Sequence, residues 1–203
     1  MKKTFSVSIL ALSVVLLFLI SVQVNKTEDT NLPGIYLMSK KCPVEYVEYA
    51  RENIRRYINS LDPSDKPSVK DLKLGNPFSF CNTDSDLFYF PVISNGSITH
   101  MLRVYKKSNG EYGAAIGKSF VEEINDLASK TSKTSPLILM MENDTAVAYV
   151  NKERTVIHEY PSGSVESETY ILPSEFEKYF NAKNSDYITV NIISDVYNIS
   201  SKR

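Results

Sequence analysis

The sequence predicts an α+β fold that combines an antiparallel sheet with one long amphipathic helix and one or two shorter helices. Between Val44 and Leu61, apolar residues recur three and four positions apart, which is the period of one helix face. From Leu72 onward, the chain consists of short runs rich in Val, Ile, Tyr and Phe, which are typical of strands. Asn-Gly pairs between these runs favour hairpins and therefore an antiparallel sheet.

The first 24 residues are expected to be a signal peptide or a membrane anchor. Lys2 and Lys3 precede an uncharged run from Phe5 to Val24. A run of this length matches the ~20 apolar residues of a membrane-spanning helix and exceeds the ~7–15 of a secretory signal. No A-x-A site or lipobox cysteine ends it. Both alternatives place the rest of the chain outside the cytoplasm, either secreted or held by a single span with its N-terminus inside.

Residues 25–41 are expected to be an extracytoplasmic tether, and residues 42–203 to be the α+β domain. Pro43 suits the first turn of the long helix, and Asp62-Pro63 should end it. The predicted apolar face of this helix contains Val44, Val47, Ala50, Ile54, Tyr57, Ile58 and Leu61. Three arginines fall outside this face and are expected to be solvated, namely Arg51, Arg55 and Arg56.

The strongest strand signal is a hairpin within Leu87–Tyr105 that turns at Asn95-Gly96. Asn-Gly favours a two-residue turn because both turn positions need positive φ. Such a turn sets the register. The predicted pairs are Ile93–Ile98, Pro91–His100, Tyr89–Leu102 and Leu87–Val104. Both faces are substantially apolar, so we expect the hairpin to be central in the sheet and covered on both sides.

Pro91 limits what can pair beside this hairpin. Proline has no N–H, and in the predicted register that N–H would have pointed away from the return strand. The hairpin therefore tolerates Pro91. A third strand beside it must skip that bond or stop there.

The middle of the chain predicts further short elements. Gly75 and Pro77 should bend the chain before a strand at Phe78–Asn82. A turn at Asn109-Gly110 leads into another short strand. The run SFVEEINDLASK predicts a helix with Ser119 as its N-cap, and Glu122 completes an S-x-x-E capping box.

The C-terminal third predicts more strands. LILMMEN should turn at Asn143-Asp144 into TAVAYVN, which should turn at Lys152-Glu153 into RTVIHEY. Beyond Pro161 we expect a weaker strand in SETYIL and a short helix in SEFEKYF. One or two strands in DYITVNIISDVYNIS should end the chain.

No catalytic, cofactor-binding or metal-binding residue is predicted, and the chain is expected not to be an enzyme. His100 and His158 lie mid-strand, outside any H-E-x-x-H motif or close Cys/His cluster. A Cys81 nucleophile with either histidine as its base is conceivable, but FCNTD carries no cysteine-protease signature. GAAIGKS has one residue too few between its glycines for a phosphate loop, and NTDSD lacks the Gly and Glu of a calcium loop.

Composition bounds the remaining possibilities. The net charge of -1 gives no electrostatic case for nucleic-acid binding. Cys42 and Cys81 could pair in an oxidising compartment, or they could remain two independent thiols. The residues of a binding surface stay unassigned at this level.

Three stretches of the chain point to a known family. They are the bend Leu74-Gly75-Asn76-Pro77-Phe78, the strand Phe88-Tyr89-Phe90-Pro91-Val92, and the helix start Ser119-Phe120. Together they resemble the propeptide of the staphopains, which are secreted papain-like cysteine proteases, over about residues 45–160. The resemblance implies a curved, half-barrel-like antiparallel sheet beside a helical segment. A staphopain continues into a catalytic domain, whereas this chain stops at Arg203, so we expect the prodomain-like part without the enzyme.

Two functions follow as expectations. The resemblance implies a non-enzymatic extracytoplasmic module that inhibits a secreted papain-like protease through an edge strand or through the segment around Pro161–Ser167. The alternative is an immunity, self-protection or other surface-binding protein, held in the membrane by residues 5–24 and unrelated to proteases, because a fold does not fix a function. The Lys-, Asn-, Ser- and Ile-rich composition is typical of a bacterial protein.

Overall fold

The computed structural model describes residues 34–68, 71–83, 86–151, 153–160 and 187–199. These residues form an α+β fold with two helices, α2 (Val44–Asn59) and α3 (Val121–Leu127), a short 3₁₀ turn η1 (Ala128–Lys130), and two open sheets. No helix among them is long and apolar enough to cross a membrane. The expected signal or anchor at residues 5–24 lies outside the described residues.

Two five-stranded sheets stand where one curved sheet was expected. Sheet A contains, in spatial order, β8 (Glu153–Glu159), β7 (Thr145–Val150), β6 (Leu137–Glu142), β1 (Tyr36–Lys40) and β9 (Tyr187–Asn191). Sheet B contains β10 (Asp195–Asn198), β2 (Lys73–Gly75), β3 (Leu87–Ser94), β4 (Ser97–Lys106) and β5 (Tyr112–Gly117).

β1 lies inside the segment expected to be a tether, and it joins β9 to the other strands of sheet A. Its backbone pairs in parallel with β6, Leu37 opposite Leu137, and antiparallel with β9. Leu37 is fully buried. The short apolar patch between polar flanks therefore gains its role only when two distant strands lie on either side of it.

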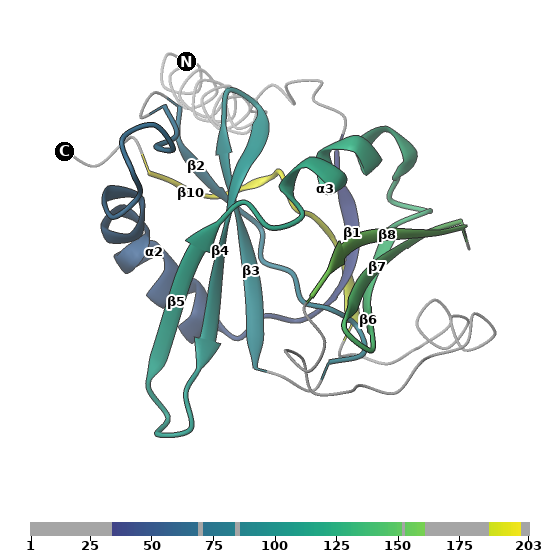
Figure 1. Ribbon diagram of the computed structural model, residues 1–203, viewed down its shortest axis with the longest axis horizontal. Coiled ribbons are helices and arrows are strands. Elements are labelled where there is room, and N and C mark those ends of the chain that lie inside the picture. The colour runs from purple at the N-terminus through teal and green to yellow at the C-terminus, as the bar shows by residue number, and fades with distance from the viewer. Residues whose placement is uncertain (1–33, 69–70, 84–85, 152, 161–186, 200–203) are drawn as a thin grey trace, which may run out of the picture. The chain divides into compact units, whose positions relative to one another are not determined.

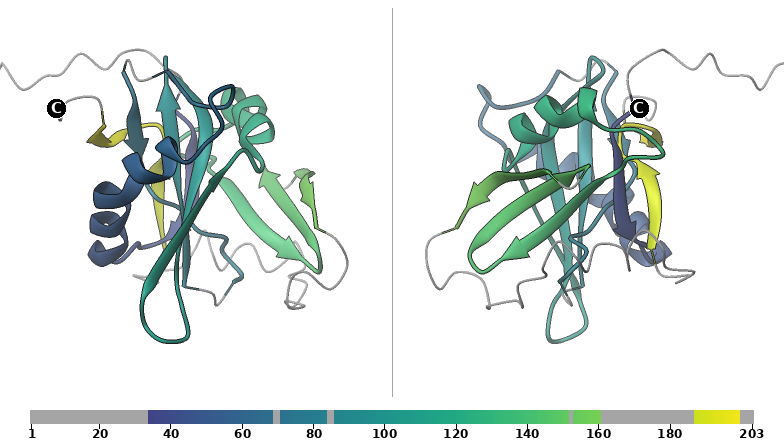
Figure 2. Two further views of the ribbon diagram at one scale, coloured as in Figure 1. Left: turned by 60° about the vertical axis from the view of Figure 1, so that its left-hand side comes forward. Right: turned by 90° about the vertical axis from the view of Figure 1, so that its right-hand side faces the viewer.

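The elements form three layers, with α2 on one face of sheet B and sheet A on the other (Figures 1 and 2). We call the two interiors the helix–sheet core and the inter-sheet core. The first contains Ala50 and Ile54 of α2 with Phe88, Phe90 and Leu102 of sheet B. The second contains Tyr89, Ile93 and Met101 of sheet B, Leu139 and Ala148 of sheet A, and Ile124 of α3. The expectation of a central hairpin covered on both faces is confirmed.

The predicted long helix is confirmed, but its buried face begins at Tyr46 and does not include Val44. Tyr46 is buried, whereas Val44 is 62% exposed. The ring of Tyr46 packs against those of Phe88 and Tyr112, each 5.0 Å away. Its hydroxyl donates to the carbonyl oxygen of Asp86 over 3.1 Å, so burial leaves its polar tip satisfied.

The hairpin turn is confirmed, but the register beyond it was predicted wrongly. Asn95 and Gly96 have φ of 51° and 79°, and Ile93 lies opposite Ile98 as expected. A β-bulge then shifts the pairing by one residue, so His100 lies opposite Val92 and not opposite Pro91. The extra residue is Thr99, whose hydroxyl donates to the carbonyl oxygen of Val92 over 3.1 Å.

The restriction at Pro91 is confirmed. β2 pairs with β3 at Ile93 and Val92 and does not pair with Pro91. Pairing on this side resumes at Tyr89, which exchanges two backbone hydrogen bonds of 2.8 and 2.9 Å with Phe78. These bonds form an isolated bridge, so the strand expected at Phe78–Asn82 was also a wrong prediction.

The helix predicted at residues 119–130 begins later than expected. It starts at Val121, and its N-cap is Phe120 in a left-handed conformation with φ of 48°, without a side-chain cap. Phe120 is buried against the rings of Tyr89 and Phe80, at 5.2 and 5.9 Å. Packing of this ring outweighs the capping box that Ser119 and Glu122 would have made.

The remaining strands agree with the sequence where the structure describes them. β5, β6, β7 and β8 follow the predicted order, although the last turn lies at Asn151, since β8 already begins at Glu153. The C-terminal run forms two strands, and they belong to different sheets. The weaker strand and the short helix expected after Pro161 lie outside the described residues.

Candidate functional site

A cleft of about 600 Å³ lies beside the first residues of β4, and we call it the β4-edge cleft. Its size falls within the range of ligand sites in proteins. The last pair between β4 and β5 is Met101 with Gly117, so Ser97–His100 extend past the neighbouring strand. The loop Ser64–Pro67 forms one wall, and the segment Lys118–Asn125 with the start of α3 forms the other.

His100 lies in this cleft because the bulge at Thr99 changes the face to which it belongs. The residue is 2% exposed. Its Nδ1 atom lies 3.2 Å from the hydroxyl oxygen of Thr99. In the tautomer that carries its proton on Nδ1, the ring donates to this hydroxyl, which itself donates to the carbonyl oxygen of Val92 over 3.1 Å. Nε2 is an acceptor in that tautomer.

The Nε2 atom of His100 is buried and has no hydrogen-bond partner among the described residues. Burial and the nearby Lys118 ammonium group lower the pKa of His100, while the carboxylate and backbone of Asp65 oppose the shift. The ring is therefore neutral at pH 7. An unsatisfied buried acceptor is rare in a native fold and costly to maintain.

An ion pair joins the two walls of the cleft. Lys118 Nζ lies 2.5 Å from Asp65 Oδ1, and their side chains are 56% and 49% exposed. The hydrogen bond from Lys118 lowers the pKa of the Asp65 carboxyl. Because both groups are solvated, the pair orients the loop but contributes little to stability.

The first turn of α3 adds Glu122 and Glu123 to the cleft. No ion pair is seen for either carboxylate within the described part of the chain. The left-handed Phe120 sets the direction in which this turn leaves β5. A bulky residue at positive φ is a genuine outlier, and such strain often occurs at functional sites.

Both histidines of the sequence line this one cleft, His158 from β8 and His100 from β4. The structure thus brings together two residues that the sequence left apart. Cys81 does not join them. Its sulfur lies 3.5 Å from the carbonyl oxygen of Met38, and burial raises the pKa of its thiol to about 12. A thiol so strongly protonated is a poor nucleophile.

The two cysteines are free thiols in different parts of the fold. Cys42 packs at the helix–sheet core, and Cys81 packs with Met38 and Tyr149 on the other face of sheet A. Burial, together with Glu45, raises the pKa of Cys42 to about 12. Of the two alternatives for these residues, the structure has the unpaired one.

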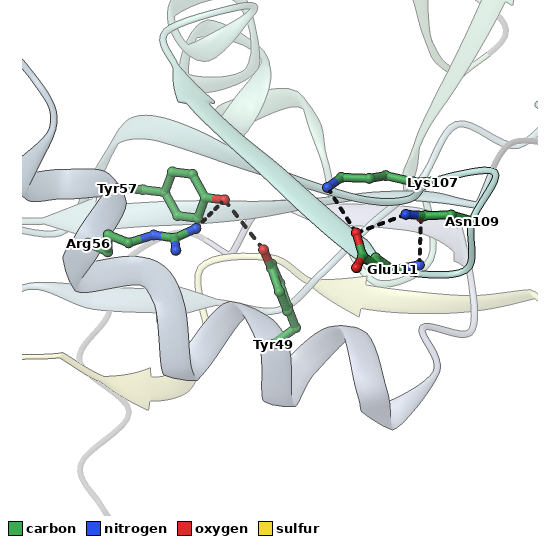
Figure 3. Close-up of polar contacts among 6 residues, drawn as sticks. All are labelled: Tyr49, Arg56, Tyr57, Lys107, Asn109 and Glu111. Atoms are coloured by element: carbon green, nitrogen blue, oxygen red, sulfur yellow. Dashed lines mark hydrogen bonds and ion pairs between the residues drawn. The ribbon is translucent and has the colours of Figure 1, made fainter.

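The three arginines of α2 are exposed, as expected, and each also makes a contact on the surface. Arg56 donates to the hydroxyl oxygen of Tyr57 over 3.0 Å, and this hydroxyl lies 3.4 Å from that of Tyr49 (Figure 3). Arg51 lies over the ring of Tyr197, and Arg55 donates to the carbonyl oxygen of Ile199. Two of the three arginines therefore fix the C-terminal strand to α2.

The other motifs that the sequence singled out have structural roles. Residues 113–117 of GAAIGKS belong to β5. Asn82 of NTDSD binds the backbone of Met141 twice, at 2.6 and 2.8 Å, and so ties its loop to β6. Among the residues that the structure covers, no group of three or more His, Cys, Asp or Glu could hold a metal ion.

Sequence reasoning missed Asp65, Lys118, Glu122 and Glu123 as members of a site. Asp65 and Lys118 are 53 positions apart, and no local pattern predicts their contact. The one usable signal was a histidine next to a threonine just after a hairpin turn, where bulges are common. No protein-family model and no curated protein sequence matches the chain.

Proposed function

We propose that this chain is a non-enzymatic, extracytoplasmic binding module of the staphopain-prodomain type, whose partner is a secreted papain-like cysteine protease. The proposal extends to a half-barrel-like curvature of the sheet, as in those prodomains. The proposed location outside the cytoplasm is based on the signal peptide or membrane anchor expected at residues 1–24, which precede the described residues.

One observation carries this proposal. The three stretches that resemble the prodomain come from three separate parts of the sequence, yet they meet in one aromatic cluster. Phe78 stacks on Tyr89 with 5.5 Å between ring centroids, and Phe120 packs edge-on against Tyr89 at 5.2 Å. A resemblance whose pieces contact one another supports a shared core more strongly than three unconnected matches would.

The β4-edge cleft supports a binding role. It combines a strand edge that β5 leaves unpaired, an apolar floor and several acceptors, while the buried thiol of Cys81 lies elsewhere. An extended segment of a partner can lie along Ser97–His100, where β5 no longer covers β4. We propose that this edge contacts the protease.

The test is inhibition of papain-like proteases by a chain that begins at residue 25. We expect a saturable loss of activity against papain or a staphopain, measured as an inhibition constant with a small fluorogenic substrate. A serine protease such as trypsin serves as the specificity control and should be unaffected. If no papain-like protease is slowed at micromolar concentrations of the chain, the protease partner is rejected.

Charge reversal on the cleft tests the contact surface. We expect Glu122→Lys with Glu123→Lys to weaken inhibition about tenfold or more, because two carboxylates on one side of the contact change sign. The matched control is Glu45→Lys with Glu48→Lys on α2, where both side chains are exposed. Equal inhibition by both double variants would move the contact away from the cleft.

The same assay bears on the alternative of an immunity or self-protection protein. That function predicts no effect on proteases but a loss of resistance to a toxin when the chain is deleted from its host. The two results are therefore separable.

A further inference from the structure

The β4-edge cleft offers hydrogen-bond acceptors more than donors. Its buried nitrogen without a partner among the described residues is His100 Nε2, which is an acceptor in the tautomer that donates from Nδ1 to Thr99. Its rim carries the carboxylates of Asp65, Glu122 and Glu123. A ligand that satisfies this set must donate hydrogen bonds.

The charges of the cleft favour a cation. Its three carboxylates face two ammonium groups, those of Lys66 and Lys118. Lys118 is already paired with Asp65 over 2.5 Å. Glu122 and Glu123, by contrast, make no ion pair that the structure records within the described residues. Two adjacent carboxylates beside a neutral histidine form a site of net negative potential.

The floor of the cleft is apolar. Ile98, Phe120 and Val121 line it, and all three are buried members of the inter-sheet core. A cationic group that contacts both the rim carboxylates and His100 brings the stem that carries it against this floor. Lysine and arginine carry their charge and their donors together at the end of an apolar stem.

The neighbouring strand edge favours a polypeptide over a free amine. Ser97–His100 continue β4 past its last pair with β5, so an extended backbone can lie beside them. Asn125 donates to the carbonyl oxygen of Ile98 over 2.9 Å and marks where that edge is already occupied. The unpaired part of the β4 edge is thus short, and it suits a single anchoring residue of a partner polypeptide better than a long added strand.

We propose that the β4-edge cleft binds the ammonium or guanidinium group of a Lys or Arg side chain of the partner polypeptide, with His100 Nε2 as the buried acceptor and Glu122 and Glu123 as the charge partners. This rests on the proposed binding function, of which it names the recognised chemistry. It does not require the partner to be a protease.

The test is an NMR titration of the full chain labelled with ¹⁵N-histidine. The probes are Nα-acetyl-lysine methylamide and Nα-acetyl-arginine methylamide. Nα-acetyl-norleucine methylamide is the control, because it keeps the stem and lacks the charge. We expect the two cationic probes to shift the ring-nitrogen resonances of His100 saturably, and the norleucine probe to leave them unchanged. Equal binding by norleucine, or no shift at His100, would overturn the proposal.

Paired variants test the carboxylates. We expect Glu122→Gln with Glu123→Gln to weaken binding of the lysine probe about fivefold or more, since two rim charges are lost. Glu45→Gln with Glu48→Gln, which removes two exposed carboxylates from α2, should leave the affinity unchanged. Wild-type affinity in the cleft variant would contradict the assignment.

Two further readouts distinguish a polypeptide from a free polyamine as the ligand, and this inference from the proposed protease partner. Spermidine binding more tightly than the lysine probe would overturn the commitment to a polypeptide. Probe binding without protease inhibition would reject the protease partner and leave this inference standing, whereas inhibition without probe binding would do the reverse.

Discussion

Two buried polar residues of this protein differ in how their hydrogen bonds are met. Glu142 in sheet A is 6% exposed and His100 in sheet B is 2% exposed. Tyr149 donates to one carboxylate oxygen of Glu142, and Arg154 donates to the other through Nε at 2.8 Å and approaches it through Nη2 at 2.7 Å. His100 has a partner for Nδ1 alone. The hydrogen bonds within the fold account for the burial of Glu142. They do not account for the burial of His100 Nε2.

The difference follows from sheet position. Tyr149 and Arg154 lie directly opposite each other on β7 and β8. Glu142 is opposite Thr145 in the β6–β7 register, so the two long side chains reach its carboxylate along the face of sheet A. His100 is paired with β3 on one side, but it lies beyond the last pair of β4 with β5, and on that side no strand among the described residues supplies a partner. An interior strand therefore completes its polar groups, while a strand end can leave one open for a ligand.

The largest expected effect comes from removing the cation beside Glu142. We predict that Arg154→Met lowers the free energy of unfolding by about 2–3 kcal/mol, because it leaves a buried carboxylate half unsatisfied. The value is below that of a fully buried pair since Arg154 is 43% exposed. Urea unfolding measures it. Arg51→Met, which loses an exposed contact with Tyr197, is the control and should cost less than ~1 kcal/mol. Equal losses in the two variants would contradict the structural role of Glu142.

A smaller effect is expected at the other oxygen of Glu142. We predict that Tyr149→Phe destabilises the fold by about 1–2 kcal/mol, because the ring stays packed while its donor is lost. Tyr105→Phe is the matched control, since this tyrosine is 38% exposed and should change stability by less than ~0.5 kcal/mol. Thermal unfolding of both variants gives the comparison, and a neutral Tyr149→Phe would show that water replaces the hydroxyl.

The contrasting prediction concerns His100. We expect His100→Leu to change the free energy of unfolding by no more than ~1 kcal/mol in either direction, because removing an unsatisfied acceptor offsets the lost bond to Thr99. The same variant should abolish binding of the lysine probe, measured by isothermal titration calorimetry because the His100 resonances are absent. A loss above ~2 kcal/mol, measured by urea unfolding, would mean that Nε2 has a partner in the folded protein.

The pH dependence of stability sharpens the same point. Burial lowers the pKa of His100, so the unfolded chain binds this proton more tightly than the folded chain does. The contribution of neutral His100 to the free energy of unfolding is therefore complete above the unfolded pKa of ~6.5. It is lost as the pH falls through the folded pKa. We expect the wild type to lose more stability than His100→Leu between about pH 7 and pH 5. Parallel curves would show that His100 does not titrate differently on folding.

The smallest effect is expected at the ion pair over the cleft. We predict that Asp65→Asn leaves the free energy of unfolding nearly unchanged, because both partners of the pair are about half exposed. Lys118 then becomes free to oppose a bound cation, so affinity for the lysine probe should fall. Glu111→Gln, which breaks the exposed pair with Lys107 at the hairpin tip (Figure 3), is the control for stability and should leave probe binding unchanged.

Much of the fold could be predicted where the signal was local. The long helix, the Asn95-Gly96 turn, the two-sided hairpin and the limit at Pro91 all follow from periodicity or from the chemistry of single residues. The predictions failed where distant segments compete. β1 and the bulge at Thr99 depend on what lies beside each strand, which spacing does not encode.

The candidate site was the least predictable part. The sequence presented His100 and His158 as two separate mid-strand residues, and Asp65 and Lys118 as ordinary surface charges. They form one cleft because a loop, a strand end, a second sheet and the start of α3 meet there. The left-handed Phe120 had no sequence signal, since its conformation is imposed by the packing of its ring.

The sequence alone determined which segments bury apolar side chains, because that depends on the 3.6- and 2-residue periods of helix and strand. It also determined the tight turns, because Asn and Gly tolerate positive φ. Only the tertiary structure decided that there are two sheets, that His100 lies opposite Val92, and that its Nε2 lacks a partner. These outcomes depend on contacts between residues far apart in the chain, and a hydrogen bond is made or left unmade only when the fold brings its two ends together.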